Sequence, residues 1–264
     1  MFASRHPLTA AILAAVLGAP CAAMAEQGKP EADRWQADVA LGLTLERGNT
    51  AKNALNATSN MSHDGLKWRH TVKLEANNEE EKVEDLSTPQ DEEFERTDES
   101  YFGSYKADRK LGSARRNYLF NVLTYEKDTF SGFQYQATYA LGFGRRLIET
   151  ERHKLEAEAG PGYRWVCLEP ETDYFDCQRD ENQRILRLAA KYQWQINENV
   201  DFRQEVASDV GPDATSTRAE SVLNSKLTQS LSMRVRYLLE HESKVLPGVK
   251  ESDHLFTVGL AYKF

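Results

Sequence analysis

Five histidines follow residue 25 and are the side chains best suited to acid–base or metal chemistry: His63, His70, His153, His241 and His254. None lies in the HExxH spacing that binds zinc on one face of a helix, and the chain has no Gly-x-Ser-x-Gly nucleophile turn. A catalytic triad also requires three residues in a fixed geometry, and no matching serine and asparagine set accompanies these histidines. We therefore assign no catalytic residue and no metal site, and we expect no cofactor.

The second group able to do chemistry is the cysteine pair, Cys167 and Cys177. Nine residues separate the two, and the absence of a third soft ligand nearby disfavours a metal site. In an oxidising compartment an isolated pair with this spacing favours a disulfide. The prediction therefore depends on whether the chain is exported.

The first 25 residues have the features of a secretory signal peptide. A positively charged start precedes a short apolar core, Leu8–Leu17, and Ala23-Met24-Ala25 forms an A-x-A cleavage site. Cleavage there would remove Cys21, whose neighbouring residues do not fit a lipidation signal. We expect residues 1–25 to be cleaved and residues 26–264 to form the mature protein.

Composition limits the class of protein. The 264 residues carry 33 Lys and Arg against 41 Asp and Glu, and this acidic balance argues against nucleic acid as a partner. The apolar share of 40% is too high for a disordered chain. No apolar stretch after residue 25 approaches the roughly 20 residues that a membrane-spanning helix needs.

Apolar and polar side chains alternate along almost the whole mature chain, which is the period of a β-strand. The segment Trp35–Glu46 shows the pattern clearly, and the final segment repeats it with Phe256, Leu260 and Phe264 on one face. Turn residues divide the chain into twelve predicted strands, near residues 34–46, 51–62, 67–79, 98–110, 116–127, 134–147, 154–167, 182–195, 200–209, 217–229, 231–243 and 252–264. Long alternating segments separated by turns are typical of a transmembrane β-barrel.

The lengths of the connections support a barrel. With the N-terminus in the periplasm, the periplasmic connections are all short and the external ones are mostly long, which is the asymmetry expected of such barrels. The acidic external loop predicted near residues 79–99 holds eleven acidic and two basic residues. Two interpretations stay open for it: a solvated loop, or a weak site for divalent cations, which carboxylates bind well.

Alternation alone does not separate a membrane barrel from a soluble periplasmic β-sandwich, because both have one apolar and one polar strand face. Strands of twelve or thirteen residues exceed the usual length in soluble domains, about five or six residues. Aromatic residues also gather at the expected periplasmic strand ends, as at a membrane interface. The chain ends with Leu260, Tyr262 and Phe264 on one face, which is similar to the C-terminal assembly signal of bacterial outer-membrane barrels. We predict an all-β fold with a single antiparallel transmembrane β-barrel of about 12 strands.

Several segments together resemble the YdiY-type salt-induced outer-membrane proteins, a family catalogued as domain of unknown function 481. The resemblance lies in the segments Leu41–Thr50, Tyr125–Phe133, Leu141–Arg145, Glu158–Tyr163 and Ser252–Phe264. It spans most of the mature chain and implies an outer-membrane barrel without catalytic residues. The acidic segment and the cysteine pair are not features of that resemblance.

The polar strand faces would line the barrel lumen. They carry a set of basic residues that includes Arg69, Arg187, Arg203 and Arg236, together with acidic residues such as Glu75. In this assignment basic residues outnumber acidic ones, so we expect a narrow pore to prefer anions. Alternatively, the charges pair across the lumen and fill it, since twelve strands lie between packed eight-stranded barrels and open sixteen-stranded porins.

These features predict a non-enzymatic protein of the Gram-negative cell outer membrane, acting as a narrow pore or as a structural, stress-related envelope protein. Its expected partners are outer-membrane lipid, lipopolysaccharide and the barrel-assembly machinery during biogenesis, and its oligomeric state is left open. The alternatives are an outer-membrane enzyme that acts on lipid and a soluble periplasmic β-sandwich that binds a ligand.

Overall fold

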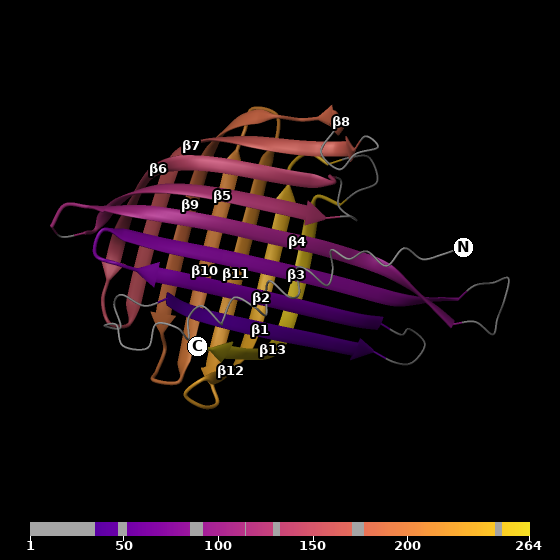
Figure 1. The fold of residues 1–264 in the computed structure, drawn as a ribbon, viewed down its shortest axis with the longest axis horizontal. Helices are drawn as coiled ribbons and strands as arrows, with labels where there is room; N and C mark the ends of the chain where they lie inside the picture. The colour runs from indigo at the N-terminus through magenta and orange to yellow at the C-terminus, as the bar shows by residue number, and fades with distance from the viewer. Residues whose placement is uncertain are drawn as a thin grey trace.

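The computed structural model describes residues 35–46, 52–84, 92–113, 115–128, 133–170, 177–245 and 250–264. The expected signal peptide, residues 1–25, lies outside them. All regular elements in the described part are strands (Figure 1): β1 (Trp35–Glu46), β2 (Lys52–Asp64), β3 (Trp68–Glu84), β4 (Glu92–Leu111), β5 (Asn117–Asp128), β6 (Tyr135–Glu149), β7 (His153–Pro170), β8 (Cys177–Asp180), β9 (Gln183–Gln195), β10 (Val200–Val210), β11 (Thr215–Lys226), β12 (Leu231–Glu242) and β13 (Ser252–Lys263). No helix in the described part is long and apolar enough to cross a membrane.

The sheet closes on itself. Consecutive wall strands pair antiparallel, β6 pairs with β7, and the last strand β13 pairs with the first strand β1. At this closing seam Leu41 lies opposite Leu260, and on the other side of β1 it lies opposite Ala57 of β2. Short β8 pairs with β7 alone, so the wall consists of twelve strands. The predicted twelve-stranded antiparallel barrel is therefore confirmed.

The register places large apolar side chains of the strands on the outside of the barrel. Leu43 and Phe256 are 64% and 66% exposed, whereas Arg236, on an opposite face, is only 3% exposed. In a soluble sandwich the apolar faces would be buried against each other. A closed barrel with an apolar exterior satisfies its backbone hydrogen bonds internally and presents hydrocarbon-compatible side chains to the surroundings. The structure is that of an outer-membrane β-barrel.

Two strand boundaries differ from the sequence-based expectation. The acidic segment near residues 79–99 was expected to be a loop, but β3 continues to Glu84 and β4 begins at Glu92, with these two residues paired. The β3–β4 hairpin is therefore longer than predicted. The connection that remains, residues 85–91, lies outside the described residues.

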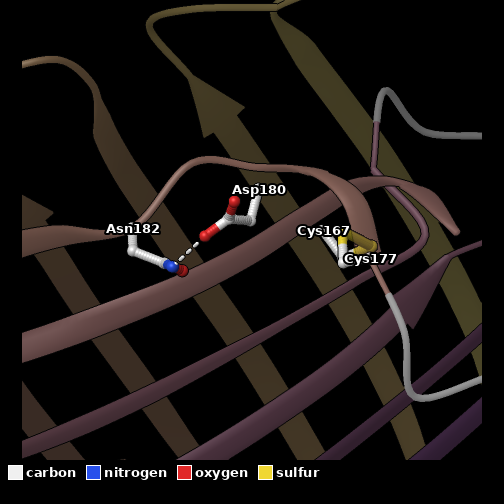
Figure 2. Close-up of a disulfide and its surroundings, with 4 residues drawn as sticks. All are labelled: Cys167, Cys177, Asp180 and Asn182. Atoms are coloured by element: carbon white, nitrogen blue, oxygen red, sulfur yellow. Dashed lines mark hydrogen bonds between the residues drawn. A yellow bond between two sulfur atoms is a disulfide. The ribbon is translucent and has the colours of Figure 1, made fainter.

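The second difference is β8, which lies within a predicted loop. Strand β8 pairs with the end of β7, and β9 pairs with the rest of β7. Residues 181 and 182 interrupt the ladder between these two pairings. Cys167 of β7 and Cys177 of β8 are joined by a disulfide, with Cα atoms 5.8 Å apart (Figure 2). The amide of Asn182 donates a hydrogen bond to Asp180 just beyond the bridge.

Glycine allows unusually close packing along β6 and β7. A Cβ atom added to Gly142 would lie 2.6 Å from the Cα atom of Gly160. On the inner face, the ring of Tyr118 lies over Gly144, where an added Cβ would come within 2.2 Å of the ring. Tyr118 also packs in a small inner cluster with Phe120, so this part of the inner wall carries aromatic side chains.

Candidate functional site in the lumen

The lumen contains two cavities, one toward each end of the barrel. One end of the barrel, the turn end, holds the start of β1, the end of β13 and the short connections 65–67, 112–116, 150–152, 196–199 and 227–230. The cavity at this end has a volume of about 670 Å³. The opposite end, the loop end, has a cavity of about 590 Å³. We call these the turn-end vestibule and the loop-end vestibule. Arg218 lines both, so the two vestibules meet at this residue.

A buried ion network crosses the lumen where the vestibules meet. Nη2 of Arg218 on β11 donates to Oε2 of Glu75 on β3 at 2.8 Å, and Arg236 on β12 donates to the same oxygen. In the wall β3 pairs only with β2 and β4, so these contacts span the interior. Glu220 accepts from Arg236, and Glu240 accepts from Arg218. We call these five residues the central bridge.

The central bridge narrows the lumen with side chains that are held in place. The side chain of Glu75 is only 5% exposed, and the guanidinium carbon of Arg218 lies 4.1 Å from the ring centroid of Phe102. Charge-assisted hydrogen bonds of this kind are about twice as strong as neutral ones. One oxygen of each of the three carboxylates accepts a hydrogen bond from a guanidinium, so the central bridge forms a preorganised and strongly polar constriction.

A second crossing lies on the turn-end side of the bridge. The ammonium of Lys73 on β3 contacts Glu205 on β10, and it lies 3.6 Å from Glu220. Lys191 on β9 also reaches Glu205, at 2.8 Å. Since β3 and β10 are not neighbours in the wall, this contact too spans the lumen.

A third group of charges fills the turn end on the side of β3 to β7. Arg69 donates two hydrogen bonds of 2.7 Å to the carboxylate of Glu156 and one of 2.7 Å to Asp108. The Tyr118 hydroxyl donates to Glu158 at 2.7 Å, and the Arg69 guanidinium carbon lies 5.2 Å from the Tyr118 ring centroid. The bidentate pair of Arg69 and Glu156 holds one wall of the turn-end vestibule in place.

The four arginines singled out in the sequence all project inward. Arg69, Arg187 and Arg203 line the turn-end vestibule, and Arg236 belongs to the central bridge. Each has an acidic partner; for Arg187 it is Asp209 at 2.8 Å, and for Arg203 it is Glu205 at 3.7 Å. The alternative in which lumen charges pair across the interior therefore describes this geometry better than a free basic stripe.

The expectation that basic residues outnumber acidic ones throughout the lumen is wrong for the loop-end vestibule, whose lining holds nine acidic and four basic side chains. Sequence reasoning missed several inward acidic residues, namely Asp38, Asp108, Glu126, Asp209, Glu220 and Glu242. The available signal was strand parity: each of these positions alternates with the exposed apolar residues of its own strand. Applying that parity to every strand would have found them.

On the exterior, aromatic and histidine rings gather near the turn end. Trp68 stacks on His70 with ring centroids 6.1 Å apart, and His153 lies 6.0 Å from Trp194 in the same way. The Nδ1 atom of His70 is 2.9 Å from the Tyr105 hydroxyl. Such a belt of amphipathic rings is expected where the wall crosses a membrane interface.

A polar stripe interrupts this exterior on β10 and β11. Ser221 donates a hydrogen bond to Gln204, and the hydroxyls of Ser208 and Thr217 are 2.9 Å apart. These residues share the outward face of Val206, which is 37% exposed. The pairing of β10 with β11 therefore places these polar side chains on the same side of the wall as Val206.

One histidine has a neighbour that the sequence did not reveal. Pairing of β12 with β13 places Ser252 opposite His241, and Nδ1 of His241 lies 2.9 Å from the Ser252 hydroxyl. The described residues supply His241 with no other recorded hydrogen-bond partner that could orient its ring. Within the described part of the chain, no group of three or more His, Cys, Asp or Glu side chains is arranged to hold a metal ion.

Among solved structures, the barrel is similar to the NanC porin, with 10% identity over 87% of this chain and 100% of that one and a TM-score of 0.47. It is also similar to the translocator domain of the autotransporter NalP from Neisseria meningitidis (14% identity, 97% and 98% coverage, TM-score 0.44). A third is the COG4313 outer membrane channel from Pseudomonas putida F1 (7% identity, 90% and 100% coverage, TM-score 0.45). At these scores the similarities carry no argument about this chain. No curated protein matches it.

The comparison with family models is specific. The model described as "Protein of unknown function, DUF481" matches residues 39–264, which span the wall from β1 to the C-terminal residue. The resemblance stated from the sequence segments is thereby confirmed. The chain belongs to the DUF481 family.

Proposed function

We propose that the protein is a non-enzymatic outer-membrane barrel that acts as a narrow pore for small ions. The observation that carries the proposal is the pair of polar vestibules, about 590 and 670 Å³, that meet at Arg218. A barrel with a purely structural role would need no such cavities, since small barrels can fill their interior with side chains. The central bridge then sets the size and charge of the narrowest point.

In this proposal the turn end faces the periplasm and the loop end faces outward, because short turns on the periplasmic side are usual in bacterial barrels. The apolar exterior would contact outer-membrane lipid, and the loop end would meet lipopolysaccharide. Tyr262 and Phe264 pack edge to face, with ring centroids 4.7 Å apart. Together with Leu260 they would present the signal that the barrel-assembly machinery recognises.

The test is conductance of the refolded full mature chain in planar bilayers. The pore proposal expects small, stable steps, since the constriction is lined by charged side chains in contact. Absence of any step from protein that shows heat-dependent mobility in SDS gels would refute it and would favour the structural envelope role. Mature protein that stays soluble without detergent would instead refute the membrane assignment.

A second candidate, an enzyme acting on lipid, is favoured by one observation, the 2.9 Å contact between His241 and Ser252 on the outer face of the wall. A histidine within hydrogen-bond reach of a hydroxyl is the minimum arrangement for an activated nucleophile. Detergent-solubilised protein with phospholipid substrate tests this candidate. Activity that disappears in Ser252→Ala and persists in the matched Ser243→Ala variant would support the enzyme, and equal background in all three proteins would exclude it.

A further inference from the structure

We infer that the two vestibules carry opposite net charge and make the pore a current rectifier, passing more current when the loop end is at the positive potential. This inference deepens the proposed function and rests on it, because it requires that the lumen conduct. It assigns a specificity-determining role to charged residues on both sides of the central bridge.

The loop-end vestibule is acidic. Its lining holds nine acidic and four basic side chains. Three of the four cations are already paired: Arg164 with Glu242 at 3.2 Å, Lys244 with Glu181 at 3.0 Å, and Arg218 within the central bridge. Local pairing therefore leaves a surplus of carboxylates, which attracts cations into this half of the lumen.

The turn-end vestibule has the opposite balance, with eleven basic and eight acidic lining side chains. Its acidic groups are shared among several cations: Glu205 alone is contacted by Lys73, Lys191 and Arg203. The surplus of positive charge concentrates anions in this half.

The central bridge keeps the two regions distinct, since Arg218 lies between them and contacts Glu75 across the interior. When the loop end is positive, cations enter through the acidic half and anions through the basic half, so both ion types accumulate at the junction and the current is large. At the opposite polarity each half excludes the ion that the field drives into it, and the junction is depleted. Rectification follows from the order of the charges along the lumen, whereas a uniformly basic or acidic pore would give selectivity alone.

The experiment records single-channel current at matched positive and negative voltages from the refolded mature chain in symmetric KCl. We expect the two currents to differ about twofold or more at 0.1 M, where the Debye length is about 10 Å, and to approach equality at 1 M, where it is about 3 Å. Equal currents at both polarities in 0.1 M KCl would overturn the inference and leave the pore proposal standing. Absence of conductance would refute both, so the two failures are distinguishable.

Variants identify the charges responsible. The double variant Asp213→Asn/Asp253→Asn removes two carboxylates from the loop-end vestibule. The double variant Lys154→Gln/Lys263→Gln removes two cations from the turn-end vestibule. Each should bring the ratio of the currents at the two polarities closer to one. The matched control, Glu151→Gln with Glu198→Gln, removes two exposed carboxylates that line neither vestibule and should leave the ratio unchanged. An unchanged ratio in both vestibule variants, or an equal fall in the control, would overturn the inference.

Discussion

Replacing Glu75 with glutamine should change the ion preference of the pore without changing its shape. Glu75 accepts hydrogen bonds from Arg218 and Arg236, and it brings the five-residue central bridge to a net charge of −1. An ion passing roughly 6 Å from this carboxylate in a water-like dielectric feels about 0.7 kcal/mol from the one charge. Screening at 0.1 M salt lowers this to about 0.4 kcal/mol, which is roughly twofold in local ion concentration.

The two ion types respond in opposite directions, so the cation-to-anion permeability ratio should fall about fourfold in Glu75→Gln. Reversal potentials in a KCl gradient measure this ratio directly. Glu151→Gln, an exposed turn position, makes the same charge change outside the lumen and should leave the ratio unchanged. A ratio that is the same in Glu75→Gln and in the unmodified protein would refute the placement of the central bridge on the ion path. The variant should also lose about 1–3 kcal/mol of stability in urea unfolding, because two buried guanidinium groups lose one of their charged hydrogen-bond partners.

Three further changes probe the wall. Reduction of the disulfide between Cys167 and Cys177 should lower the unfolding free energy by about 2–3 kcal/mol, the loop-closure entropy expected for a loop of this length. Urea unfolding measures the loss, and Cys167→Ser/Cys177→Ser is the matched variant. Alkylation of both thiols without reductant would show that the disulfide is absent. Deletion of Phe264 should lower the yield of heat-modifiable barrel in cells, and an unchanged yield would contradict the assembly role. Gly142→Val should prevent closure between β6 and β7, because its side chain would collide with the backbone of β7, whereas Gly103→Ala, whose added Cβ would lie 3.8 Å from Leu74, should still give heat-modifiable barrel.

The alternation of side chains was sufficient to predict the antiparallel barrel and its twelve wall strands. It succeeds because a one-residue shift would move an entire apolar face into the lumen, so the register is strongly specified. Boundaries were less predictable where this constraint ends. The extension of β3 to Glu84 and the short strand β8 are mostly polar in sequence, so they show no alternation of apolar and polar residues from which a strand could be predicted.

The cross-lumen contacts were not predictable from the chain for a different reason. Glu75 and Arg218 are separated by 143 positions, and their meeting depends on the tilt and stagger of all the strands between them. Alternation fixes which side of the wall a residue occupies but not its height in the barrel. The sequence could therefore nominate inward arginines such as Arg236 while leaving open whether they form a free stripe or a paired network.

The position of β3 explains why pairing prevails. Its inward residues Arg69, Lys73 and Glu75 include both signs of charge and reach β7, β10 and β11 on other parts of the wall. Each contact joins residues far apart in the sequence, so forming it before the barrel closes costs loop-closure entropy. It therefore stabilises the protein fully only when the barrel has closed. A single strand thus both narrows the pore and braces the closed wall. Changes that widen the lumen at β3 are therefore expected to weaken the barrel, so conductance and stability cannot be tuned independently at this strand.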